Sequence, residues 1–228
     1  MNYIKWNEQD SRYIKGLVIC ELPPITKPQM RVAETVVDGV DGSVIEELGY
    51  ATYDKALAIG ITQKANIDEV IKFFSGTGEV VFSNEPDKFY KATIINQIDY
   101  ARLVRFRTAT ITFRVQPFKY EYDEQTVTLT ESGSIFNDGN YIAKPIIEIK
   151  GTGTIELTVN GDTVFSYTFP DGDDAVVIDS QKQDAYVGTI LKNRNMVGEF
   201  PAFEIGANAI SWEGNITSLS VSYKSRWL

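Results

Sequence analysis

The chain has 228 residues, and its 22 lysines and arginines against 31 aspartates and glutamates give a formal net charge of -9 at neutral pH. It has no histidine and one cysteine, Cys20, which excludes histidine-based catalytic triads and metal sites, an intrachain disulfide and a CxxC zinc or redox site. Its acidity disfavours nucleic-acid binding, which depends on lysine and arginine, and no apolar stretch is long enough for a membrane span. The first residues lack the apolar core of a secretory signal, so we expect a protein made in a cytosol.

The first predicted elements, between residues 3 and 37, are short extended runs. Pro23 and Pro24 exclude a helix around them, because each lacks an amide donor and holds its predecessor extended. A strand is predicted from Arg31 to Val37, and two turn signals follow within residues 38–42. We interpret this region as a long excursion between strands rather than as a tight hairpin.

One short helix is predicted to begin after Asn66, a favoured N-cap residue that precedes two acids and an apolar stripe. Strands are then predicted over residues 79–83, 88–99 and 103–115. In the last of these, the face that carries the apolar residues changes midway. We therefore expect that strand to pass from an exposed segment into a packed sheet.

The second half is predicted to consist of short strands separated by turns at nearly regular spacing. Asn160-Gly161 is its strongest hairpin signal, because a type I′ turn needs positive φ at both central residues. This density of strands indicates a sandwich or jelly roll, and we predict two domains, 1–124 and 125–228. The strands are predicted at residues 146–150, 155–159, 163–169, 175–179, 186–191, 203–205, 209–212 and 219–223.

No motif in the sequence predicts catalysis, a metal or a cofactor. The glycine pairs at 76–78 and 151–153 do not complete a phosphate-binding pattern, so we interpret the first as a helix cap and the second as a strand connector. The acids at 171–174 lack the ligand spacing of an EF-hand and read as a solvated turn. A pair of carboxylates for glycoside hydrolysis can be neither found nor excluded among 31 acids.

Four of the arginines, Arg102, Arg105, Arg107 and Arg114, fall within thirteen residues of the predicted strand 103–115 and its approach. One interpretation is a solvated edge strand that charge protects from aggregation. The other is an arginine-bearing interface with an acidic partner or with acids of a neighbouring copy. Both remain open, and the four residues are our candidates for a subunit interface.

Three aromatic residues of the second half, Tyr186, Trp212 and Trp227, are candidates for stacking on sugar rings if they are exposed. A sandwich core also needs large aromatic side chains, so core packing is the alternative.

The order of many small features across both halves resembles the distal tail protein (Dit) family of siphophages that infect Gram-positive bacteria. The features of the first half are Trp6-Asn7, Asp10-Ser11, residues 22–25 and 38–42, Gly49-Tyr50 and residues 116–120. Those of the second half are Asn137, Gly139, Lys144-Pro145, residues 151–153, Asn160-Gly161, Ile178-Asp179, residues 198–201 and 206–208, and Gly214.

The resemblance implies a fold and a role. The family fold has an N-terminal sandwich-like or barrel-like domain that forms a hexameric ring at the tail tip, and a galectin-like C-terminal sandwich that projects outward. The ring joins the tail tube to the tail-associated hub protein, and in some members the outer domains dock receptor-binding proteins. We therefore expect a virion protein without enzymatic activity, with saccharide binding by the C-terminal domain as the alternative function.

Overall fold

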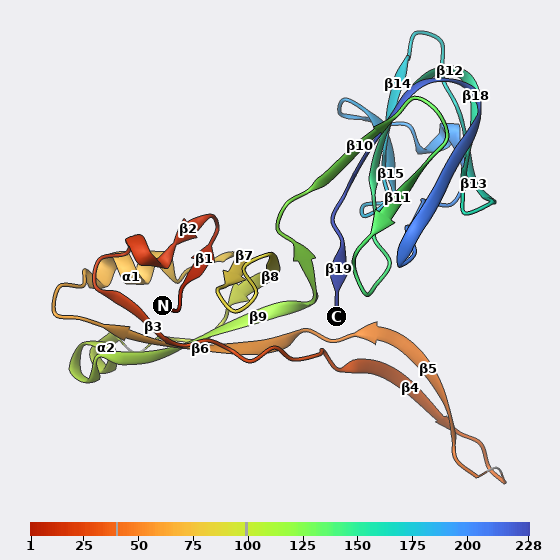
Figure 1. The fold of residues 1–228 in the computed structure, drawn as a ribbon. Coiled ribbons are helices and arrows are strands. Elements are labelled where there is room, and N and C mark those ends of the chain that lie inside the picture. The colour runs from red at the N-terminus through yellow and green to blue at the C-terminus, as the bar shows by residue number, and fades with distance from the viewer. Residues whose placement is uncertain (40, 99) are drawn as a thin grey trace. The chain divides into compact units, whose positions relative to one another are not determined.

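The computed structural model describes residues 1–39, 41–98 and 100–228, apart from the side chains of residues 100–102. The fold is mainly β, as predicted, and its described part contains two α-helices where the sequence predicted one (Figure 1). The chain forms two compact units, Met1–Tyr120 with Leu228, and Glu121–Trp227.

The N-terminal unit is built on one twisted sheet. Its strands alternate between buried and exposed side chains; on β6 (Tyr53–Ile61), for example, Leu57 and Ile59 face the core. Strand β6 pairs antiparallel with β3 (Leu17–Glu21) on one side and with β9 (Thr108–Glu121) on the other. In sheet order the strands are β2 (Gln9–Asp10), β1 (Ile4–Trp6), β7 (Thr77–Phe82), β8 (Lys88–Ile94), β9 (Thr108–Glu121), β6 (Tyr53–Ile61) and β3 (Leu17–Glu21).

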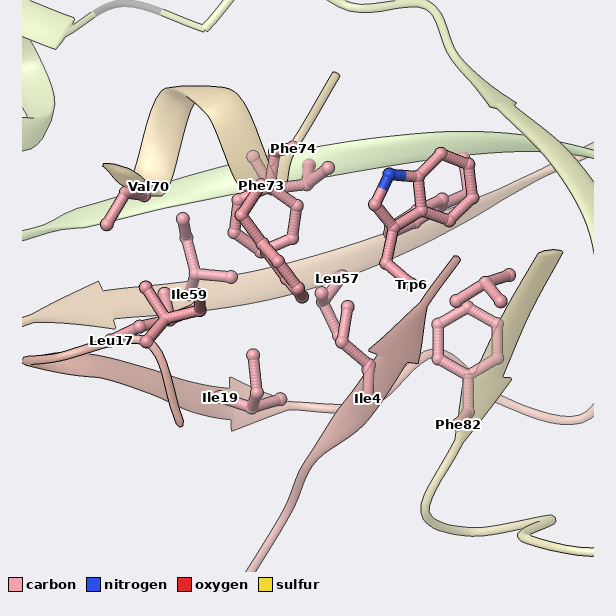
Figure 2. Close-up of a cluster of buried hydrophobic side chains, with 14 of the residues drawn as sticks. Ile4, Trp6, Leu17, Ile19, Leu57, Ile59, Val70, Phe73, Phe74 and Phe82 are labelled. Atoms are coloured by element: carbon pink, nitrogen blue, oxygen red, sulfur yellow. The ribbon is translucent and has the colours of Figure 1, made fainter. Parts of the chain in front are cut away.

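The predicted helix is confirmed as α1 (Ile67–Phe73), which covers the core face of this sheet (Figure 2). The side chain of Asn66 caps it by accepting a hydrogen bond of 3.1 Å from the amide of Asp68. Phe73 and the following Phe74 point toward the strands, and both are 3% exposed. A short 3-10 turn, η1 (Ser11–Tyr13), follows β2.

The prediction of a strand from residue 103 is wrong for its first residues, which form α2 (Tyr100–Phe106). Of the α2 side chains that the structure describes, only Leu103 is buried, whereas Val104 and Phe106 are 46% and 59% exposed. The alternation of apolar and charged residues therefore does not mark two faces of a strand. The amide of Arg107 closes the helix on the carbonyl of Leu103 at 2.8 Å, and Arg107 turns the chain into β9 with a φ of 62°.

A second sheet of the N-terminal unit has only two strands, β4 (Met30–Val36) and β5 (Ser43–Tyr50). We call the residues 30–50 the arm. The predicted excursion is thus a hairpin with a long connection, and it extends away from β3 and β6 (Figure 1). The side chains of its two strands are all exposed or half-buried.

The C-terminal unit is a sandwich whose two layers share the long strands β12 (Ile146–Val159) and β18 (Gly206–Tyr223). Residues 146–150 of β12 pair with 218–222 of β18 and with β14 (Ala175–Asp179). Residues 156–159 of β12 pair with 210–213 of β18 and with β13 (Asp162–Thr168). Gly151-Thr152-Gly153, predicted to connect two strands, lies inside β12 at the irregular corner between the layers. The Asn160-Gly161 hairpin is confirmed, with φ values of 55° and 93°.

The remaining strands extend these two layers around a continuous apolar core that includes Ile147, Leu157 and Val221. The strands of these layers and their one 3-10 turn are β10 (Gln125–Leu129), β11 (Gly133–Asn137), β12 (Ile146–Val159), β13 (Asp162–Thr168), β14 (Ala175–Asp179), β15 (Asp184–Val187), β16 (Ile190–Leu191), η2 (Asn193–Asn195), β17 (Met196–Gly198) and β18 (Gly206–Tyr223). The short strand β19 (Arg226–Trp227) follows β18 and belongs to neither layer.

Candidate assembly surfaces

The end of α2 forms an exposed patch that combines charge with apolar area. We call Val104, Arg105, Phe106 and Arg107 the α2 patch; all four side chains are exposed. The guanidinium of Arg105 lies over the ring of Phe106, 5.3 Å from its centroid. Of Arg102, only the backbone within α2 is described, and its side chain lies outside the described residues.

Arg114 is separated from this patch, so the expectation that one strand carries all four arginines is wrong. It lies on β9 and forms a bidentate ion pair with Asp54 of β6, with N–O distances of 2.8 and 3.0 Å. The hydrogen bonds from Arg114 hold the pKa of the Asp54 carboxyl below its ordinary value. Its charge is therefore already matched within the chain.

The arm carries acids and exposed apolar side chains on the same face. Cross-strand pairs place Val32 opposite Glu47, Glu34 opposite Ile45 and Val36 opposite Ser43, and paired residues share a face. Val36 and Ile45 are 72% and 61% exposed. We call Val32, Glu34, Val36, Ile45 and Glu47 the acidic face of the arm.

The second strand of the arm was not predicted, although the sequence carries a signal for it. Two β-branched runs, one ending at Val37 and the other containing Val44 and Ile45, flank the turn residues 38–42, and that pattern is typical of a hairpin. A hairpin of two strands is at best marginally stable alone in water. The two strands of the arm therefore contribute little stability of their own.

The root of the arm is fixed to the sheet by hydrogen bonds to the proline pair. The ammonium of Lys55 on β6 donates to the carbonyl of Pro24 at 2.8 Å, and the side-chain amide of Asn84 donates to the carbonyl of Pro23 at 3.1 Å. The rings of Tyr50 and Phe118 meet edge to face with centroids 6.0 Å apart. The strands of the arm thus start from a fixed position.

Lys55 is a buried cation, only 3% exposed, and lies over the ring of Tyr90 at 4.8 Å. Burial lowers its pKa to about 8, against the attraction of Glu85 and with a further small lowering by Lys119. Glu85 also forms an ion pair with Lys119 and accepts a hydrogen bond of 2.6 Å from the hydroxyl of Tyr90. These charges and hydrogen bonds hold the arm's root and the sheet together.

In the C-terminal unit, the three candidate aromatic residues lie on three different strands: Tyr186 on β15, Trp212 on β18 and Trp227 on β19. All are half-buried, and Trp212 packs against the core. Tyr186 is opposite Val177 in one layer and Trp212 is opposite Leu157 in the other, so these two do not form one platform. Their role in sugar binding stays a prediction.

The C-terminal unit has a cavity of about 400 Å³, and none of these three aromatic residues lines it. Polar and apolar groups share its wall, which is formed by Lys144, Ser180, Gln183, Glu199, Phe200, Pro201 and Ala202.

Among the described residues, no group of acids and cysteine is arranged to hold a metal ion. In the acidic turn at residues 171–174, Asp173 forms an ion pair of 2.6 Å with Lys192. None of the helices that the structure describes has the length and apolar character needed to cross a bilayer.

Comparison with known proteins finds similar structures but no similar sequences. No protein-family model and no curated protein matches the chain. A chain of the phage P2 baseplate in its activated conformation with Ca aligns over 98% of both chains, with a TM-score of 0.53 and 8% identity. The Dit protein (gp 19.1) of phage SPP1, a hub adsorption protein of a phage that infects Gram-positive bacteria, aligns over 100% of both chains with a TM-score of 0.75 and 13% identity. Across its whole length, this chain therefore has the fold of a Dit protein, as the sequence resemblance implied.

Proposed function

We propose that this protein is a structural, non-enzymatic subunit of a phage tail tip, where six copies form a ring through their N-terminal units. The ring connects the tail tube to the tail-associated hub protein, and the C-terminal units support host-adhesion components. The observation that carries this proposal is the likeness to SPP1 Dit over the full length of both chains. The ring domain corresponds to residues 1–124 and the outer domain to residues 125–228.

Two properties of the chain support assembly into a ring. The arm exposes a marginal two-stranded sheet with several large apolar side chains, which a second chain would bury. The net charge of -9 keeps copies soluble and repels DNA that passes through the ring. Such a protein assembles in the bacterial cytoplasm and then resides in the virion.

The mass of the purified full-length chain in solution tests the proposal. We expect a species of six copies of 25.6 kDa, seen by light scattering and as six-fold rings by electron microscopy. Antibody against the chain should label the tail end farthest from the capsid. A chain that remains monomeric at high concentration, with no hub or tube protein retained on it, would contradict the proposal.

Saccharide binding by the C-terminal unit is the second candidate function, favoured by the cavity at Phe200. Gln183 and Glu199 supply hydrogen-bonding groups beside this aromatic ring, a combination suited to a sugar. Binding of cell-wall polysaccharide that Gln183→Ala weakens would support the cavity. If a folded Trp212→Ala variant loses polysaccharide binding while Gln183→Ala binds normally, the binding site would instead lie at the aromatic candidates.

A further inference from the structure

We propose that the α2 patch of one copy binds the acidic face of the arm of the next copy, so that the ring closes through a head-to-tail contact. This inference rests on the proposed ring and names the two surfaces that form it.

The chemistry of the α2 patch calls for an acidic partner with apolar area. Arg105 and Arg107 provide two guanidinium groups, and no ion pair of either appears within the described residues. Val104 and Phe106, beside them, are about half exposed. Arginine beside an exposed aromatic ring is typical of interface centres, where a guanidinium pairs with a carboxylate in two-point geometry.

The acidic face of the arm supplies matching groups. Glu34 and Glu47 lie among Val32, Val36 and Ile45, all of them exposed. The arm has five acids, Glu34, Asp38, Asp41, Glu46 and Glu47, against the single base Arg31. Contact between the two surfaces would therefore pair two arginines with two carboxylates and bury apolar side chains of both.

The position of the two surfaces makes the contact intermolecular. The arm precedes Tyr53 at the start of β6, whereas the α2 patch meets Ile61 at its end, where the Ile61 amide donates to the carbonyl of Arg107 at 2.9 Å. These ends are separated by the length of a nine-residue strand, roughly 25 Å, and the arm extends away from α2 (Figure 1). Each copy thus offers one surface at each end of β6, as a head-to-tail ring requires.

Charge reversal on either surface tests the contact. We expect Arg105→Glu with Arg107→Glu, and separately Glu34→Lys with Glu47→Lys, to convert the ring into monomers and to weaken self-association by about tenfold or more. All four side chains are exposed, so each variant should stay folded, as Trp6 fluorescence would show. The combined four-residue variant restores opposite charges and should restore the ring. Matched controls are Glu46→Lys, on the opposite face of the arm, and Lys72→Glu, exposed on α1.

Mixing the two assembly-deficient variants tests the head-to-tail order. In the mixture, the normal α2 patch of the arm variant can bind the normal arm of the α2 variant, and the two reversed surfaces, which again carry opposite charges, can bind each other. Two variants that are each monomeric alone should therefore assemble into a ring that contains both in equal number. If the wild type forms a ring that neither reversal affects, or if Glu46→Lys disrupts it as strongly, the inference is wrong and the proposed function stands. If the wild type forms no ring, the proposed function itself fails.

Discussion

Replacing the buried Lys55 by methionine should change how the stability of the N-terminal unit depends on pH. Methionine keeps the length and apolar stem of the side chain but removes its charge and its hydrogen bond to the carbonyl of Pro24. We expect the free energy of unfolding of the wild type to rise relative to that of Lys55→Met as the pH is raised from about 8 to about 10.

The sign follows from the direction in which burial moves the pKa of Lys55, from 10.5 to about 8. Below pH 8 both the folded and the unfolded chain hold the proton, and the fold bears the full cost of the buried charge. Between the two pKa values the folded chain has released its proton while the unfolded chain still binds one, so stability rises with pH. Integration between pH 8 and 10 gives an increase of about 2 kcal/mol.

Urea unfolding followed by tryptophan fluorescence can isolate this effect. Trp6 is 3% exposed in the core of the N-terminal unit, so a background with Trp212→Phe and Trp227→Phe reports on that unit alone. Wild type and variant are compared at one protein concentration, because assembly adds to apparent stability by mass action. Lys72→Met, which removes an exposed lysine of α1, is the control.

The change with pH in the stability difference between wild type and Lys55→Met shows whether the charge of Lys55 is buried at a cost. If the free energy of unfolding of the wild type minus that of Lys55→Met stays constant between about pH 8 and about pH 10, the claim that Lys55 is desolvated in the fold is refuted. If that difference falls as the pH is raised, attraction to Glu85 outweighs burial. Measurements stop at pH 10 because burial raises the pKa of Tyr53 to about 12 and also raises that of Tyr90. Folded tyrosines that hold their protons longer than unfolded ones lower the stability above that pH.

Substitutions at four other positions test parts of the fold. Gly214→Ala should destabilise the C-terminal unit by about 2 to 4 kcal/mol, because its new Cβ would lie 2.5 Å from the carbonyl oxygen of Thr154 at a φ of 93°. Gly153→Ala, which has a φ of 73° but nothing within 4 Å of its new Cβ, should cost only about 1 kcal/mol; equal costs in urea unfolding would contradict the steric argument. Asn66→Ala should destabilise the N-terminal unit by about 1 kcal/mol through loss of the α1 cap, and Asn66→Asp should restore it; two equal melting temperatures would show that the cap contributes nothing. Arg114→Ala should leave both the melting temperature and the mass in solution unchanged, because the ion pair with Asp54 is solvent-exposed; loss of the ring would instead place Arg114 in the subunit contact.

The sequence predicted well those elements that a local motif determines, and those in which the alternation of apolar and polar residues reflects packing on the chain's own core. Asn66 determines the start of α1 through a hydrogen bond to a residue two positions away, and Asn160-Gly161 determines a turn through its own backbone angles. Nothing local reveals that β12 continues through Gly151 and Gly153 from one layer of the sandwich into the other. That continuity depends on pairing with β18, whose residues are more than fifty positions away in the sequence.

The arm and α2 were misjudged for a common physical reason. Periodicity identifies a strand or helix when one face packs on the chain's own core and the other meets water. In the arm, Val36 and Ile45 share an exposed face with Glu34, and in α2 the exposed Phe106 lies between Arg105 and Arg107. Apolar and charged residues thus mix on one surface, and the contrast that periodicity needs is lost. A surface that a second copy covers would carry such a mixture, because it has to stay soluble before assembly and yet bury apolar area afterwards. The arm and α2, where this mixture conceals the structure from the sequence pattern, are the two segments that we assign to the subunit contact.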